Sequence, residues 1–162
     1  MGDWQESQRM TTLCTIGTAG RRDDDFTAVL KQHQIDAVID IRLRNEGRYY
    51  KFASGKHIKA LCEANGIAYR HDTRFSPTAE MLDRFRADSD WSAYERAYRA
   101  LIRERDMPGI WAEVAGGFQR PCLMCAERAA EKCHRRLLGE ALVGGDSARL
   151  EHLQSAVHHA AP

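Results

Sequence analysis

The chain lacks a long apolar run and a strong charge bias. No segment of its 162 residues approaches the ~20 apolar residues of a membrane-spanning helix. Residues 1–10 are polar and lack the apolar core of a signal peptide, so we expect a cytoplasmic protein that does not contact membranes. The formal net charge of +1 excludes a strongly basic protein that coats nucleic acid, but it allows a local basic patch.

The sequence also gives no sign of a disulfide framework or of a standard nucleotide-binding motif. Five cysteines are present, and an odd number in a cytosolic chain argues against a disulfide framework. There is neither a GxGxxG motif nor a P-loop. The nearest feature is a turn of Gly17, Thr18 and Gly20 followed by Arg21, which we expect to approach a substrate phosphate. A plain tight turn is the alternative.

What is present is an alternation of short apolar runs and helical patterns. With 43% hydrophobic residues, the chain can bury the core of one domain. Strands are predicted at 13–16, 35–41, 67–71 and 120–125. Helices are predicted from Asp23 or Asp24 to His33, from a Ser54 cap to Asn65-Gly66, from Ser76-Pro77, after an Asp90 cap, over 108–115 and over 133–143.

This order predicts a single three-layer α/β domain with a mostly parallel central sheet flanked by helices. We expect the domain at residues 13–145, between tails at 1–12 and 146–162. In such sheets ligands bind beyond the carboxyl ends of the strands. The predicted strands end in polar or reactive residues, which should converge there: Gly17 and Thr18, Asp40 and Arg42, His71, and Cys125 and Glu127.

An aromatic and aliphatic stripe follows the Asp90 cap. Its members recur at helical spacing: Trp91, Tyr94, Tyr98, Leu101 and Ile102. Such spacing is more typical of a buried helix face than of a platform for stacking bases. We therefore predict that the stripe belongs to the core.

The densest cluster of reactive residues lies between the last predicted strand and helix. Cys125 and Glu127 follow the strand, and Cys133, His134 and Arg135 open the helix. A thiol near a helix N-terminus, beside Arg and His, is in surroundings that favour the thiolate. We therefore predict catalytic roles for Cys125 and Cys133 and substrate contacts for His134 and Arg135. The alternative is that the cysteines pack as small hydrophobic residues.

The same cysteines invite comparison with zinc sites, which we do not expect here. On a strand over 120–125, residues three apart face opposite sides, so Cys122 and Cys125 cannot share a metal. The spacing also lacks the second half of a usual finger. A site formed by Cys125, Cys133 and His134 remains the alternative. The prediction is that no metal or other cofactor is bound.

Asp40 and Arg42 end the second predicted strand with opposite charges. Residues two apart on a strand share a face, so Asp40 can orient Arg42. Asp40 can also act as a base or stabilise developing positive charge. A structural ion pair is the alternative.

The segment 42–59 is rich in basic residues with aromatic residues between them. Arg42, Arg48 and Lys51 alternate there with Tyr49 and Tyr50, and Glu46 is the one acidic residue. Basic groups bind phosphates and aromatic rings stack on bases, which predicts a nucleic acid or nucleotide partner. A solvated basic loop is the alternative.

These motifs together resemble the bacterial and archaeal domain-of-unknown-function family 488. The resemblance runs from Thr15 to about Leu142, and its most specific part is Cys125-Ala126-Glu127 followed by Cys133-His134-Arg135. Two segments depart from the usual pattern: Asn45–Arg48 stands in place of Pro-x-Ser-Arg, and Phe75–Thr78 in place of Leu-Gly. The resemblance implies a fold and a site, but little about the reaction.

Our first hypothesis is an enzyme that hydrolyses an N-glycosidic bond at a base in nucleic acid, as a DNA glycosylase does. Asp40 or Glu127 would activate water or stabilise an oxocarbenium-like sugar. A loop tyrosine would stack on the extruded base. Three arginines would hold phosphate: Arg42, Arg48 and Arg135.

Two other hypotheses use different features. In the second, Cys125 or Cys133 is the nucleophile of a sulfur-transfer or redox enzyme, with Arg135 holding an anion. The order strand, cysteine, loop and helix is loosely similar to that of rhodanese-type domains. In the third, the chain is a non-catalytic module that binds nucleic acid.

The basic segment generates the first testable prediction. Replacing Arg44, Arg48 and Lys51 with alanine should weaken oligonucleotide binding and flatten its dependence on salt, because fewer counterions are released. Filter binding across a salt series measures both quantities. An unchanged slope would exclude nucleic acid as the partner of this loop.

Overall fold

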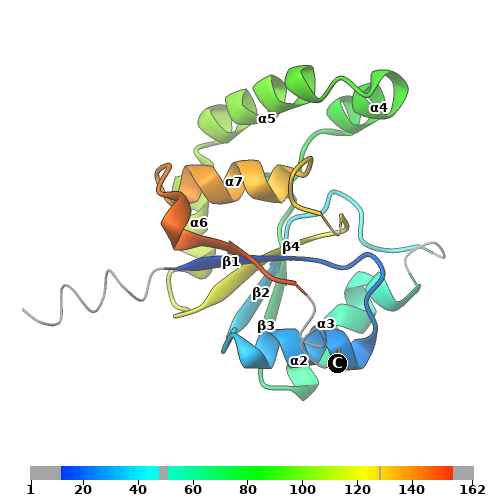
Figure 1. Ribbon diagram of the computed structural model, residues 1–162, viewed down its shortest axis with the longest axis vertical. Helices are drawn as coiled ribbons and strands as arrows, with labels where there is room; N and C mark the ends of the chain where they lie inside the picture. The colour runs from blue at the N-terminus through cyan, green and yellow to red at the C-terminus, as the bar shows by residue number, and fades with distance from the viewer. Residues whose placement is uncertain (1–11, 48–50, 128, 155–162) are drawn as a thin grey trace, which may run out of the picture.

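A parallel sheet forms the centre of the molecule. The computed structural model describes residues 12–47, 51–127 and 129–154. All strand pairs are parallel, and the order is β3-β2-β4-β1-β5 (Figure 1). The strands are β1 (Leu13–Gly17), β2 (Ala37–Asp40), β3 (Ala68–His71), β4 (Pro121–Cys125) and β5 (Leu150–His152). The first four lie where the apolar runs predict them.

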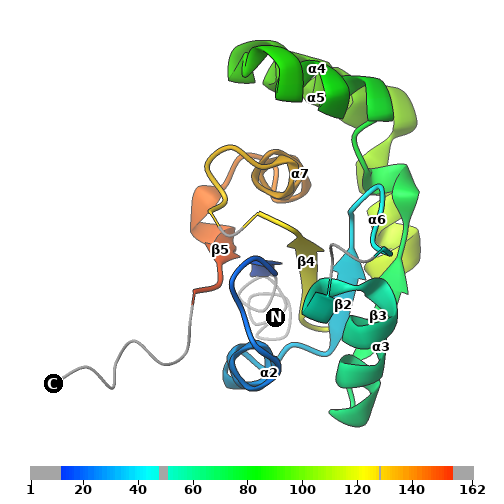
Figure 2. The ribbon, with the colours of Figure 1, turned by 90° about the vertical axis from the view of Figure 1, so that its right-hand side faces the viewer.

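Helices cover both faces of the sheet (Figure 2). In the orientation of Figure 1, α2 (Asp23–Gln32) and α3 (Gly55–Ala64) lie on the lower face. The upper face carries α5 (Trp91–Arg105), α6 (Met107–Ala115) and α7 (His134–Leu142), while α4 (Ala79–Asp88) packs on α5. The chain is thus a three-layer α/β domain, as predicted. Among the helices of the described ranges, none has the length and apolarity needed to cross a bilayer.

The predicted caps explain where two of these helices begin. Ser54 accepts a hydrogen bond from the His57 N–H at the start of α3, and Asp90 accepts one from the Ala93 N–H at the start of α5. Each satisfies a backbone donor that has no partner within the helix. Both predictions are confirmed.

The predicted start of α4 at Ser76-Pro77 is wrong. Ser76 is extended, and its hydroxyl is used to donate to the carbonyl of Ile41 at 3.0 Å. The helix starts at Ala79, because Thr78 accepts from the Met81 N–H and serves as the cap. Residues 76–78 therefore form a link that attaches the chain to the end of β2.

The boundary of the predicted C-terminal tail also needs correction. Leu150–His152 lies within 146–162 yet forms the edge strand β5, paired with Leu13–Thr15 of β1. Gly139 of α7 lies against this strand, since a Cβ there would lie 2.7 Å from Cδ1 of Leu150. A larger residue at position 139 would require the Leu150 side chain to shift.

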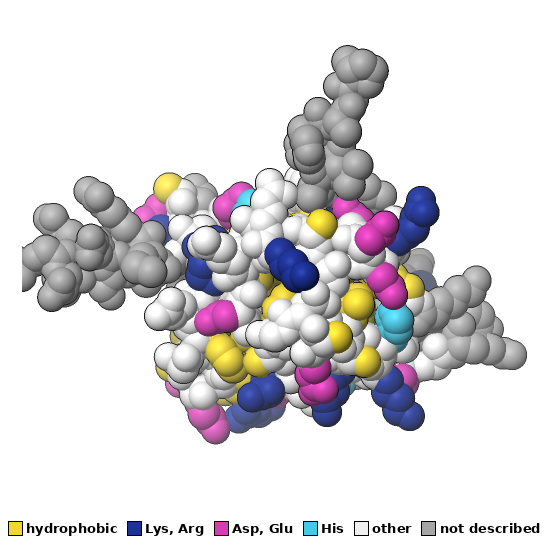
Figure 3. Space-filling model, turned by 90° about the horizontal axis from the view of Figure 1, so that it is seen from below, with side chains coloured by type: hydrophobic (Ala, Val, Ile, Leu, Met, Phe, Trp, Pro, Cys, Tyr) yellow, Lys and Arg dark blue, Asp and Glu magenta, His cyan; other side chains and the backbone are white. Residues whose placement is uncertain are grey.

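The sheet separates two apolar cores. The lower core includes Ile16, Phe26 and Ile58, and the outer surface of α2 and α3 beneath it carries interspersed acidic and basic side chains (Figure 3). The upper core contains the predicted stripe: Tyr94, Tyr98, Leu101 and Ile102 are buried, and Trp91 packs at the margin. The stripe is core, as predicted.

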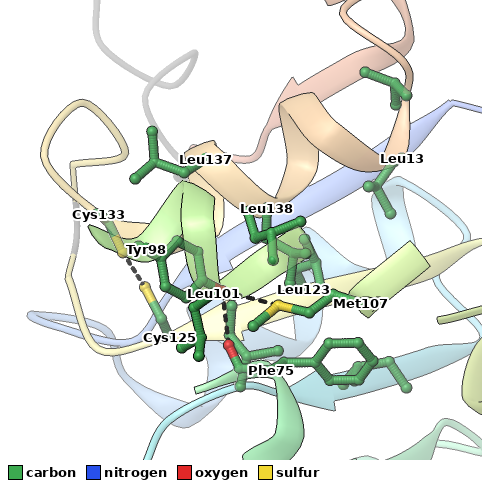
Figure 4. Packing of buried hydrophobic residues seen from close by; sticks show 14 of the residues in the cluster. Leu13, Phe75, Tyr98, Leu101, Met107, Leu123, Cys125, Cys133, Leu137 and Leu138 are labelled. Carbon is green, nitrogen blue, oxygen red and sulfur yellow. Dashed lines mark hydrogen bonds between the residues drawn. The ribbon is translucent and has the colours of Figure 1, made fainter. Parts of the chain in front are cut away.

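The hydroxyl of Tyr98 ties the upper helices to the segment before α4. It donates to the carbonyl of Phe75 at 2.7 Å inside the core (Figure 4). In Tyr98→Phe that buried carbonyl loses its partner, so we expect the free energy of unfolding to fall by about 1–3 kcal/mol. Urea unfolding measures the change.

Tyr94→Phe is the matched control, because the Tyr94 hydroxyl makes no hydrogen bond to the described residues. Its loss should change stability by less than about 0.5 kcal/mol. Equal effects of the two substitutions would contradict the assigned role of the Tyr98 hydroxyl.

Candidate active site

A pocket of about 200 Å³ opens at the carboxyl ends of β2 and β4. Its floor is formed by the residues that follow these strands and by the start of α7, and its opposite wall by α4 and the first turn of α5. A second cavity, of about 330 Å³, lies between α4 and α5, but neither cysteine nor histidine lines it. The reactive side chains predicted from sequence therefore point to the first pocket.

Two thiols lie together in the floor of this pocket. Cys125 ends β4, and Cys133 immediately precedes α7 in an extended conformation. Their sulfur atoms are 2.7 Å apart, and both cysteines are free (Figure 4). Each residue is nearly buried, at 1% and 3% exposure, and each contributes to the lining of the pocket. The loop between the two cysteines therefore brings the start of α7 back to the end of β4.

The guanidinium of Arg135 fixes this pair. Its Nη1 donates to Cys125 Sγ at 3.1 Å and also to the carbonyl of Glu127. Its Nε donates to the Thr15 hydroxyl at 3.1 Å. The hydroxyl in turn lies 2.5 Å from Nδ1 of His152 on β5. The cation of α7 is therefore bonded to β1, to the end of β4 and to the loop that follows.

The two thiols differ in acidity. Burial by itself would raise the pKa of Cys125, but the hydrogen bond from Cys133 and the charge of Arg135 lower that pKa below its ordinary value. Burial and the neighbouring Cys125 raise the pKa of Cys133. Cys125 is therefore the more acidic of the two thiols, and Cys133 is placed to donate a hydrogen bond to it.

His134 lies beside Cys133 as a neutral ring. Burial lowers the pKa of His134 to about 4. Its Nε2 donates to the carbonyl of Ile41 at 3.2 Å, since a carbonyl can only accept. Nδ1 then has a free lone pair, and it lies 3.9 Å from Cys133 Sγ. The ring contributes no positive charge to the pocket.

The other three cysteines belong to the lower core. Burial raises the pKa of Cys14 to about 11 and that of Cys62 to about 12, and it raises the pKa of Cys122 well above its ordinary value. Cys122 and Cys125 face opposite sides of β4, as the strand spacing predicts. Among the described residues, no group of three His, Cys, Asp or Glu side chains could hold a metal ion.

Asp40 lies on the other side of the sheet from the thiols. Its side chain is fully buried and accepts hydrogen bonds from Arg42 at 2.8 and 2.9 Å, from the Tyr69 hydroxyl at 2.5 Å and from Asn45. Although burial opposes it, the hydrogen bonds from Arg42 hold the pKa of Asp40 below its ordinary value. Asp40 does not line the pocket; it orients Arg42, which does.

The remaining predicted site residues divide into three groups. Glu127 is exposed and lines the pocket. Gly17, Thr18, Arg21 and His71 are used within the fold: Arg21 binds the carbonyls of Gly17 and Leu153, the Thr18 N–H extends the ladder to Cys125, and His71 binds the carbonyl of Arg42. Arg48, Tyr49 and Tyr50 lie outside the described residues.

Sequence reasoning missed the wall of the pocket. Leu82, Phe85 and Arg86 of α4 complete it together with Trp91 and Tyr94 of α5. The helical spacing identified the α5 residues only as core. No local signal in α4 indicates that it lies over β2 and β4.

Comparison with known proteins identifies one related group. The model of the family described as "Domain of unknown function DUF488" matches residues 22–142, which is most of the chain. No curated protein and no solved structure matches the chain.

The acidity of Cys125 is directly testable. In the fully reduced protein, iodoacetamide should label Cys125 at a lower pH than any other cysteine, because only its pKa is lowered. Arg135→Gln should move the labelling midpoint to higher pH, whereas Arg135→Lys should keep part of the effect. Mass spectrometry of the labelled peptides gives each midpoint.

Arg136→Gln is the control for these variants. Arg136 is the next residue on α7, and it binds the carbonyl of Glu131 and the carboxylate of Glu140 instead of sulfur. The Arg136→Gln substitution should leave the pH midpoint of Cys125 labelling unchanged. An Arg135→Gln midpoint equal to that of the wild type would refute the role of this guanidinium.

Proposed function

The chain belongs to the DUF488 family, and we propose that it is a thiol-dependent oxidoreductase in which Cys125 and Cys133 cycle between dithiol and disulfide. The observation that carries the proposal is the 2.7 Å separation of the two sulfur atoms in the floor of an open pocket. The buried cation beside Cys125 adds support, because a nucleophilic thiol has to be a thiolate.

The first step is thiol–disulfide exchange. The Cys125 thiolate attacks one sulfur of a substrate disulfide, the substrate S–S bond breaks, and a mixed disulfide forms at Cys125. The released substrate thiolate takes the proton of Cys133. Arg135 has by then lost the negative charge of Cys125, so its positive charge stabilises the Cys133 thiolate instead.

The second step closes the protein disulfide. The Cys133 thiolate attacks Cys125 Sγ, the mixed disulfide breaks, and the second substrate sulfur leaves and takes a proton from solvent. Two electrons pass from the protein dithiol to the substrate, which leaves as two thiols. A small monothiol restores the dithiol by the reverse exchange and is itself oxidised to its disulfide.

The geometry favours this chemistry over sulfur transfer. A persulfide formed on Cys125 would lie next to Cys133, whose attack on the inner sulfur would expel hydrosulfide and close the disulfide. Transfer of sulfur to an outside acceptor would have to be faster than this intramolecular attack, in which the Cys133 sulfur has a high effective concentration at Cys125.

Hydrolysis of an N-glycosidic bond stays a prediction with weaker support. It needs a carboxylate beside the sugar, and Asp40 is bound by Arg42 and Tyr69 on the lower side of the sheet. Among the described lining residues, Glu127 is the one carboxylate, and it is exposed to solvent. The pocket therefore supplies one carboxylate but two adjacent thiols.

The test is equilibration in glutathione redox buffers followed by mass spectrometry of alkylated protein. The wild type should form one Cys125–Cys133 disulfide. Cys133→Ser should accumulate a mixed disulfide at Cys125, and Cys125→Ser should reduce bis(hydroxyethyl) disulfide at least about 100-fold more slowly than the wild type. Cys122→Ser, in the lower core, is the matched control and should keep the wild-type rate.

Two results would overturn the proposal. One is a reduced Cys125–Cys133 pair in strongly oxidising buffer. The other is release of free base from oligonucleotides by the wild type that is lost in Glu127→Gln and kept in both cysteine variants, because that pattern would support hydrolysis.

A further inference from the structure

The wall of the pocket that faces the thiols is aromatic. Phe85 of α4 and Trp91 and Tyr94 of α5 contribute to this wall and pack on one another. The Trp91 and Tyr94 rings are nearly parallel, at 23° with centroids 5.2 Å apart, and Phe85 lies 5.8 Å from Trp91 and 5.2 Å from Tyr94. The wall therefore offers a flat apolar group a surface on which to pack.

The rim of the same pocket is positive. Basic side chains outnumber carboxylates in the described lining, with Arg42, Arg44, Arg86 and Lys132 against Glu127. Arg42 is neutralised by Asp40, and Arg86 lies 3.4 Å from Asp83. Neither Arg44 nor Lys132 has an ion-pair partner among the described residues. Both are exposed, so they can meet a ligand.

The geometry points to a substrate class that combines both features: a small disulfide with a flat, preferably aromatic group next to the sulfur and a carboxylate or similar anion beyond it. The disulfide in this inference rests on the proposed dithiol chemistry. The flat group follows from the aromatic wall, and the anion follows from the cationic rim. A pocket of about 200 Å³ is below the ~300–1,000 Å³ that drug-sized ligands fill, which favours a small molecule.

Each part of the substrate then has an assigned contact. The flat group packs between the thiols and the rings of α4 and α5. The anion lies at the rim near Arg44 and Lys132, which come from different segments of the chain, one after β2 and one before α7. The sulfur next to the flat group faces Cys125.

Four disulfides test the two features separately: bis(carboxyphenyl) disulfide, bis(aminophenyl) disulfide, dithiodipropionate and cystamine. Each rate with the reduced protein is divided by the rate of the same disulfide with mercaptoethanol, which removes differences in intrinsic reactivity. The anionic aromatic compound should rank first and cationic cystamine last. Equal normalised rates for all four would overturn the substrate class and leave the dithiol chemistry standing.

Variants assign the preference to residues. Arg44→Gln and Lys132→Gln should each reduce the preference for anions by up to about fivefold. Trp91→Leu should reduce the preference for aromatic compounds by about tenfold. Lys59→Gln is the matched control, because Lys59 is an exposed cation of α3 that does not line the pocket. An effect of Lys59→Gln as large as that of Arg44→Gln would refute the assigned rim.

A binding measurement separates this inference from the thiol chemistry. In Cys125→Ser/Cys133→Ser, quenching of tryptophan fluorescence should report tighter binding of nitrobenzoate than of nitroaniline, and Arg44→Gln should reduce the difference. If the difference appears but no dithiol chemistry does, the pocket assignment stands and the proposed reaction falls. If nitrobenzoate and nitroaniline bind equally, the substrate class falls.

Discussion

The carboxyl edge of the sheet depends on one buried cation. Arg135 is 1% exposed, and a charge in such a place costs free energy unless acceptors surround it. The acceptors around it include the Thr15 hydroxyl of β1, the Cys125 sulfur of β4 and the Glu127 carbonyl of the next loop. Satisfying one guanidinium therefore sets the positions of β1, β4 and α7 relative to one another. The same charge lowers the pKa of Cys125, so the structural role and the proposed chemical role belong to one interaction.

The sheet also separates reactive from inert thiols. Successive residues of a strand face opposite sides, which places Cys122 in the lower core and Cys125 in the upper core, three residues away. Burial raises the pKa of Cys14, Cys62 and Cys122, and at Cys14 it outweighs the charge of Arg120, whose Nη2 lies 3.8 Å from Sγ. Cys125 is just as buried, but it has Arg135 and Cys133 as hydrogen-bond donors. Cys125 therefore differs from the other three cysteines in its hydrogen-bond partners and not in its exposure to solvent.

The positive charge of the pocket comes from its exposed rim. Asp40 and Arg42 neutralise each other at the end of β2, whereas Arg44 and Lys132 line the pocket without an ion-pair partner among the described residues. The aromatic rings of α4 and α5 cover the opposite side. The thiols therefore lie between a positive rim and an apolar wall, an arrangement suited to a flat anionic molecule.

Much of this could be predicted from sequence alone, because it depends on residues that are neighbours along the chain. Apolar runs located β1 to β4, the capping residues Ser54 and Asp90 located two helix starts, and strand alternation excluded a shared metal on Cys122 and Cys125. The convergence of Arg42, Cys125 and Glu127 on one pocket also followed, since parallel strands end at one edge. These inferences use the fixed geometry of a strand or a helix turn.

Other features were decided only by packing between elements distant in the sequence. β5 joins the sheet by pairing with β1, 137 residues away in the chain, and α4 starts late because Ser76 bonds to the end of β2. The partners that enclose Asp40 come from β3 and from the loop after β2, and the distance between Cys133 and Cys125 depends on the position of α7 over the sheet. Local patterns carry no information about such contacts, because hydrogen bonds and close packing across layers form only after the layers assemble.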